Sequence, residues 1–123
     1  MSSVTYPCNV LIVDDDVDIR EALVDVLADH GYPATAVANG REALDYLHAG
    51  DRPCLILLDL MMPVMNGAQF RAAQLGDPAL RDLPVLLISA GNDLEQRSAA
   101  LATESMRKPI DLSRLLEVVA RHC

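Results

Sequence analysis

The chain has 123 residues, of which 51% are hydrophobic, and its formal net charge is −8. This length suits one domain with a single core, and the hydrophobic content excludes a disordered chain. The acidic balance argues against direct binding of nucleic acid or of an anionic membrane surface, and no apolar run approaches the ~18 residues of a membrane-spanning helix.

The cysteines and the first residues bear on the compartment. Cys8, Cys54 and Cys123 are odd in number and have no metal-ligand spacing. We predict that Cys54 is a small core residue and that a disulfide framework is absent, as in a reducing compartment. Residues 1–6 lack the basic start and the apolar stretch of a signal peptide. These features favour a soluble, cytoplasmic protein with no membrane partner.

Short apolar runs alternate with helical patterns along the chain. The apolar runs predict strands at 10–13, 34–38, 54–58 and 85–88, with a weaker strand at 104–107. Capping residues and helical spacing predict helices from 16 or 18 to about 30, from 39 to 50, from about 68 to 75, from 92 or 93 to about 101, and from 111 or 113 onward. A strand is therefore followed by a helix five times.

Five strand–helix units predict an α/β fold with a doubly wound parallel sheet. Strands that are continuous apolar runs are typical of a parallel sheet covered by helices on both faces. Crossovers are right-handed by default, and five strands suit the flavodoxin-like order 2-1-3-4-5. That order places the first and third strands side by side at a switch point, where ligands bind beyond the carboxyl ends of the strands.

Three carboxylates, which we call the acidic cluster (Asp14, Asp15 and Asp59), would meet in that crevice. Oxygen-only ligands select a hard cation, namely Mg²⁺, Mn²⁺ or Ca²⁺. A carboxylate can also act as a nucleophile and form an aspartyl phosphate. Lys108, near the end of the fifth strand, can neutralise phosphoryl oxygens, and the Ser89 hydroxyl can donate to another. The pattern predicts a site for a divalent cation and a phosphoryl group.

Each candidate also has a purely structural interpretation. Residues 14–16 could only cap and charge the first helix, and Asp59 could be a turn residue. Ser89 could be a strand-end hydroxyl and Lys108 a solvated lysine. Two further groups are expected to have no chemical role, a packed methionine cluster and three surface histidines: Met61, Met62, Met65, His30, His48 and His122.

Five motifs in order resemble those of one known family. They are the segments 11–16 (LIVDDD), 57–63 (LLDLMMP), 66–67 (NG), 87–90 (LISA) and 108–109 (KP). With these motifs the chain is similar to the CheY-like receiver domain of response regulators in two-component signalling. The resemblance covers essentially residues 8–122 and implies a single receiver domain within 1–123.

The resemblance implies a role for each site residue. Asp59 would be the phosphoacceptor, Lys108 would pair with the phosphoryl oxygens, and Ser89 would follow the phosphate on activation. The bond between Lys108 and Pro109 would be cis.

The resemblance also implies the ligands of the metal. Asp15 would bind it directly, Asp14 directly or through water, and Asp59 and the backbone carbonyl of Met61 would complete the set. Mg²⁺ is the expected ion, with Mn²⁺ as the alternative.

The implied function is that of a stoichiometric signalling protein, not an enzyme, which assists its own phosphorylation and dephosphorylation. A sensor histidine kinase or a histidine phosphotransfer protein would phosphorylate Asp59 and thereby switch partner binding. Output would come from a separate protein or from an output domain outside this sequence. The alternative is a receiver-like interaction module that works without phosphorylation. An aspartyl phosphatase is disfavoured because Met61 stands where such enzymes place a second acid.

Two departures from the family concern the readout of phosphorylation. Ser105 stands where the family usually has an aromatic residue, and Leu101-Ala102-Thr103 replaces the usual Gly-Ala before the fifth strand. The stretch from Ser89 to Lys108 is short by about three residues, nearly one helical turn. The chemistry at Asp59 is well supported by the motifs, whereas the usual aromatic switch is not.

Overall fold

The computed structural model describes residues 9–50, 52–62, 64–90, 96–97, 99, 101 and 104–122. Its five strands form one parallel sheet in the order β2-β1-β3-β4-β5, which confirms the predicted doubly wound topology. The elements are β1 (Val10–Val13), α1 (Val17–Asp29), β2 (Ala34–Val37), α2 (Gly40–His48), β3 (Leu55–Asp59), α3 (Gly67–Leu75), β4 (Val85–Ser89), β5 (Glu104–Arg107) and α5 (Leu112–His122).

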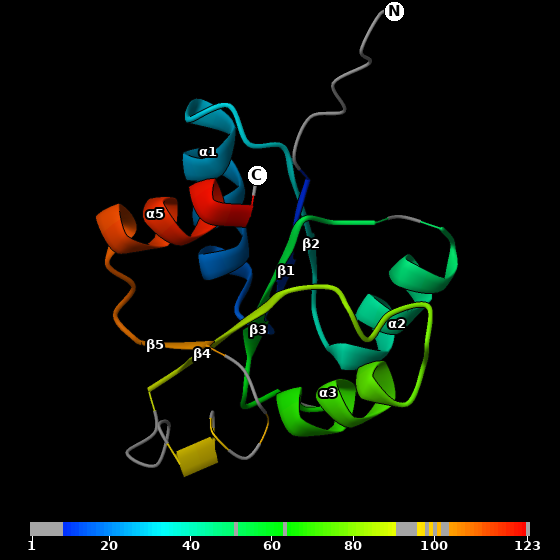
Figure 1. The fold of residues 1–123 in the computed structure, drawn as a ribbon. Coiled ribbons are helices and arrows are strands. Elements are labelled where there is room, and N and C mark those ends of the chain that lie inside the picture. The colour runs from blue at the N-terminus through cyan, green and yellow to red at the C-terminus, as the bar shows by residue number, and fades with distance from the viewer. Residues whose placement is uncertain are drawn as a thin grey trace, which may run out of the picture.

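Helices cover both faces of the sheet, with α1 and α5 on one side and α2 and α3 on the other (Figure 1). Successive side chains of a strand point to opposite faces, so each buried strand serves two cores. In β1, Val10 and Ile12 pack in the cluster with α1 and α5, whereas Leu11 and Val13 pack in the cluster with α2 and α3. This double burial explains why the central strands are continuous apolar runs.

Side-chain caps set where the helices begin. Asp16 accepts hydrogen bonds from the backbone N–H groups of the first turn of α1, and Asn39 does the same for α2. Asn66 forms a reciprocal capping box with Gln69 at the start of α3. The expected helix from 92 or 93 to about 101 lies largely outside the described residues, although residues 96, 97 and 99 are helical.

Gly67 brings α3 directly against the end of β3. Its N–H donates to the carbonyl of Leu60 at 3.0 Å, and a Cβ at this position would lie 2.7 Å from the carbonyl oxygen of Asp59. Any larger residue would therefore push α3 away from the strand end. The sequence predicted that α3 begins at about residue 68, one residue later than observed.

Three predictions about side chains need correction or confirmation. Cys54 packs against the core as predicted, but it is disulfide-bonded, so the expected absence of disulfides is wrong. The other two cysteines lie outside the described residues. Met62 and Met65 pack against the core, whereas Met61 is 66% exposed because it lies in the loop after β3.

Among the described residues, no helix is both long and apolar enough to cross a membrane.

Candidate functional site

The candidate residues converge at one edge of the sheet, where the parallel strands end. Asp59 is the last residue of β3 and Ser89 the last of β4, while Asp14 follows β1 and Lys108 follows β5. The register aligns Val13 with Leu58, so Asp14 and Asp59 leave adjacent strands side by side. The topology thus assembles residues that are 94 positions apart in the chain.

The acidic cluster is compact. One carboxylate oxygen from each of Asp14, Asp15 and Asp59 lies within 4.8 Å of the others. Asp14 and Asp59 are buried, at 4% and 5% exposure, whereas Asp15 is exposed. Like charges this close repel strongly, and a hard cation with oxygen ligands relieves that repulsion. The donor set therefore suits a divalent cation that remains open to solvent on the Asp15 side.

Lys108 supplies the positive charge inside the site. Its ammonium group lies 3.2 Å from Oδ2 of Asp14 and 3.5 Å from Oδ2 of Asp59. Its backbone N–H donates to the carbonyl of Ser89 at 3.0 Å, and its bond to Pro109 is cis, as predicted. The lysine thus contacts two members of the acidic cluster and is anchored by its main chain to the end of β4.

Backbone donors hold the second oxygen of each buried carboxylate. Oδ1 of Asp14 accepts from the N–H of Asp16 at 2.9 Å, and Oδ1 of Asp59 accepts from the N–H of Met61 at 3.2 Å. Each buried carboxylate therefore has one oxygen bound by the loop that follows it and one facing Lys108. This arrangement orients both groups before any ligand binds.

Burial and charge shift the two central ionisable groups. Desolvation, and then repulsion by Asp14, raise the pKa of Asp59 above its ordinary value, while the Met61 N–H and Lys108 oppose the rise. Burial alone would lower the pKa of Lys108, but the carboxylates of Asp59 and Asp14 outweigh it and raise that pKa. The lysine is therefore charged at neutral pH, and the ionised Asp59 is held at a cost in free energy.

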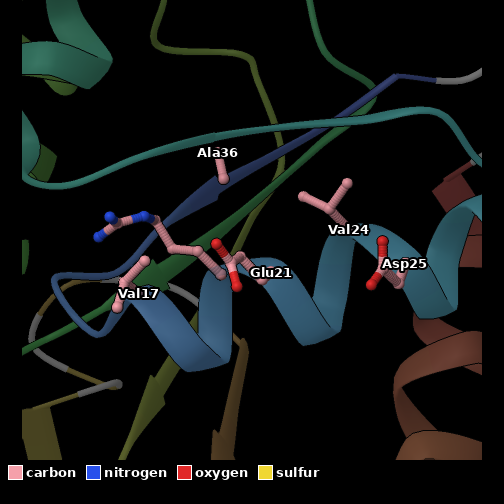
Figure 2. A pocket seen from close by; sticks show the side chains of 6 residues that line it. Val17, Glu21, Val24, Asp25 and Ala36 are labelled. Carbon is pink, nitrogen blue, oxygen red and sulfur yellow. The ribbon is translucent and has the colours of Figure 1, made fainter.

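Arg20 contacts the site, although no motif of the sequence singled it out. Its guanidinium donates to the backbone carbonyl of Asp14 at 2.8 Å, and its side chain lines a surface hollow between α1 and β2. Figure 2 shows Val17, Glu21 and Val24 along α1 in this hollow, facing Ala36 of β2. The signal that could have identified Arg20 is a cation one turn into a helix that follows an acidic strand end. Arg20 steadies the loop that carries the acidic cluster.

Ser89 and Met61 are placed as the sequence predicted, but their roles stay predictions. Ser89 is buried at the end of β4, at 2% exposure, beside the carboxyl end of β3. Met61 follows Asp59 by two residues, and its N–H contacts that carboxylate. Ser105 is half-buried in β5, opposite Leu87 of β4.

The chain is similar to receiver domains over nearly its whole length. The family model of the response regulator receiver domain matches residues 10–120. Response regulator MprA of Mycolicibacterium vanbaalenii is 38% identical over 115 residues, which are 89% of this chain and 48% of that protein. The chain therefore spans about half the length of the curated relatives it matches.

Solved structures agree with the sequence comparison. A response regulator receiver protein from Pseudomonas putida has a TM-score of 0.87 and 30% identity, covering 96% of this chain and 99% of that one. The signal receiver domain of a signal transduction histidine kinase from Syntrophus aciditrophicus has a TM-score of 0.85 and 34% identity, covering 94% and 89%.

Proposed function

Because the chain belongs to the response regulator receiver domain family, we propose that it accepts a phosphoryl group on Asp59 and thereby switches the binding of a partner. Receiver domains are signalling modules rather than conventional enzymes. We therefore expect each protein molecule to take up one phosphoryl group and not to turn over a substrate. The observation that carries the proposal is the buried Asp59 carboxylate, 3.5 Å from the Lys108 ammonium and within 4.8 Å of the other acids.

The transfer follows from the orientation of Asp59. An oxygen of its carboxylate attacks the phosphorus of a phosphohistidine, the new O–P bond forms, and the N–P bond to imidazole breaks, so the imidazole leaves with the electron pair. The Met61 N–H holds Oδ1, which keeps the carboxylate from rotating away. The burial of Asp59 shields its carboxylate from bulk water and strengthens the charge interactions around it.

Lys108 is placed to stabilise the product. It shares its ammonium between Asp14 and Asp59 in the free protein, and phosphoryl oxygens bring a stronger acceptor to the same place. Ser89, at the end of the neighbouring strand, is the hydroxyl that we assign to another phosphoryl oxygen.

We assign the metal ligands to the acidic cluster and to the backbone carbonyl of Met61. A bound Mg²⁺, or Mn²⁺ in its place, would neutralise charge on the phosphoryl oxygens. The three carboxylate oxygens within 4.8 Å of one another support this assignment. The exposed Asp15 leaves room for the waters that Mg²⁺ retains.

The partners follow from the chemistry of the donor. A sensor histidine kinase or a histidine phosphotransfer protein would present a phosphohistidine to Asp59, in a cytoplasmic setting. We propose a single receiver domain over residues 1–123, with output through a separate protein or an attached output domain. Family membership supports these assignments.

The test is incubation with Mg²⁺ and a small-molecule phosphodonor such as acetyl phosphate, followed by intact mass measurement. The wild type should gain one phosphoryl group, and Asp59→Asn should gain none. Asp77→Asn, which removes a carboxylate far from the site in the loop after α3, is the matched control and should label like the wild type. Equal labelling of Asp59→Asn would refute the assignment, and no labelling of the wild type would favour the phosphorylation-independent interaction module.

A further inference from the structure

Helix α3 carries a buried polar pair, Arg71 and Gln74, that the phosphoryl chemistry does not use. Arg71 is 8% exposed and Gln74 is 0% exposed. They lie on the same face of the helix as the buried Gly67 and Phe70, and Arg71 also lines a polar hollow at the surface. Burial lowers the pKa of Arg71 below its ordinary value, yet a guanidinium stays charged at neutral pH. A buried charge persists in a core only where acceptors hold it.

The acceptors come from two segments beyond α3. Arg71 Nε donates to the carbonyl of Leu101 at 3.0 Å, and Arg71 Nη1 donates to the Gln74 side chain at 2.8 Å. Gln74 in turn donates to the carbonyls of Leu80 and Leu83 at 3.0 and 2.9 Å. The pair therefore fastens α3 to the loop that enters β4 and to Leu101, which shortly precedes β5.

The hydrogen bond from Arg71 to the Leu101 carbonyl lies where a positive charge is electrostatically favourable. The N–H of Leu101 donates to the carbonyl of Arg97 at 2.9 Å, which is the hydrogen-bond spacing of an α-helix. The Leu101 carbonyl thus lies at the carboxyl end of a helical turn, where a cation is favourable. Arg71 supplies that cation from a neighbouring helix.

The other end of α3 is fixed to the phosphoacceptor. Gly67 leaves no space for a side chain against the backbone of Asp59 and Leu60, since an added Cβ would lie 2.7 Å from the Asp59 carbonyl oxygen. Arg71 follows one turn later, about 6 Å along the helix axis. Close-packed elements shift as units rather than deform, so a displacement of the Asp59 backbone moves α3 and the Arg71 guanidinium together.

We propose that Arg71 is a positioning residue that couples the phosphorylation state of Asp59 to the β5 edge of the sheet, through α3 and the Leu101 carbonyl. The inference rests on the proposed function, because the phosphoryl group on Asp59 is its input. Beyond Leu101 lies β5, where Glu104 pairs with Arg121 of α5 at 2.9 Å. The coupled surface is therefore the one formed by β5 and the end of α5.

The test compares the amide hydrogen exchange of four proteins with and without Mg²⁺ and beryllofluoride, a phosphoryl mimic. Arg71→Met keeps much of the apolar stem but removes every donor, whereas Arg71→Lys keeps a charged ammonium donor. Arg81→Met is the matched control, because Arg81 is an exposed arginine in the same polar hollow as Arg71. Urea unfolding of each protein measures its stability separately.

We expect the mimic to change exchange both near Ser89 and over residues 104–107 in the wild type and in Arg81→Met. Arg71→Met should keep the response near Ser89 and lose at least half of the response over 104–107. Arg71→Lys should restore part of the lost response. If Arg71→Met does not fold, Arg71→Leu replaces it, because leucine has no donor for the Leu101 carbonyl.

The outcomes separate coupling from a merely structural role. A full response over 104–107 in Arg71→Met, or an equal loss at both places, would overturn the inference. A wild type that gains the phosphoryl group by mass but shows no response over 104–107 would overturn it while leaving the proposed function intact. A wild type that takes up no phosphoryl group overturns the proposed function, and with it the input on which the coupling depends.

Discussion

Replacing Asp59 with asparagine should stabilise the protein when no divalent cation is present. Asp59 is 5% exposed, and its carboxylate lies in the acidic cluster, within 4.8 Å of an oxygen of Asp14. Asparagine has nearly the same shape, and its side-chain oxygen can still accept the Met61 N–H. The substitution therefore removes a buried charge with little loss of packing.

The size of the gain follows from three opposing energies. Two unit charges no more than 4.8 Å apart repel by at least roughly 3.5 kcal/mol at an effective dielectric constant of about 20. The attraction between Lys108 and Asp59, 3.5 Å apart, is worth roughly 4.7 kcal/mol at the same dielectric constant and favours the ionised carboxylate. Desolvation of the charge costs several kcal/mol and reverses this balance, in agreement with the raised pKa of Asp59. We expect a net gain on the order of 1–2 kcal/mol in the free energy of unfolding.

The pH dependence has a defined sign. The folded-state pKa of Asp59 lies above the ordinary value of 3.8, so the folded protein holds this proton more tightly than the unfolded chain. Relative to Asp59→Asn, the wild type is at no disadvantage below pH 3.8, and it loses stability as the pH rises through the raised pKa. The advantage of the variant should therefore be larger at pH 7 than near pH 4.

Urea unfolding in EDTA at both pH values measures this difference. Asp77→Asn is the control in which the pKa shift has the opposite direction. The N–H of Ala79 and then His48 lower the pKa of the Asp77 carboxyl, so removing this charge should not stabilise the protein. If Asp59→Asn is less stable than the wild type at neutral pH without metal, the reasoning from burial and repulsion is wrong.

Three further predictions concern the ligands of the site. Mg²⁺ should stabilise the wild type, because it binds the acidic cluster only in the native state; the free energy of unfolding should rise by about 2.7 kcal/mol at a hundred times the dissociation constant, and the melting temperature with it. Asp15→Asn should blunt this rise, and a wild type whose melting temperature does not respond to Mg²⁺ would count against the metal site. Lys108→Ala should leave Mg²⁺ binding nearly intact but weaken the spectral response to beryllofluoride; an unaltered response would refute its role. The largest change in amide exchange on adding beryllofluoride should fall between residues 89 and 101, and a response confined to 104–107 would contradict this.

The fold could be predicted because its rules are local. Burial on both faces of the sheet explains the continuous apolar runs, and the caps Asp16 and Asn39 begin their helices as expected. The acidic cluster could be predicted because parallel strands end at a common edge, so residues after each run must meet. Element ends differed by a residue where tertiary contact decided, as at Gly67 against Asp59.

The features that could not be predicted share a physical cause: each is a contact whose partner lies far away in the sequence. A disulfide at Cys54 depends on which segments meet in space, and cysteine counting alone does not show that. Arg71 and Gln74 occupy an apolar stripe of α3, and that mismatch was readable, but their acceptors are backbone carbonyls far along the chain. Carbonyl positions carry no side-chain signal in a sequence.

The same repulsion that destabilises the free protein is the source of its affinity for ligands. Removing charge from the acidic cluster by mutation relieves the repulsion permanently, whereas a cation relieves it only while bound. A ligand that binds only the native state stabilises it by mass action, so the energy held in the cluster reappears as binding energy. The raised pKa of Asp59 and the expected Mg²⁺ dependence are therefore one property measured in two ways. A variant that gains stability without metal should lose an equivalent part of its response to metal, and measuring both in Asp59→Asn checks that equivalence.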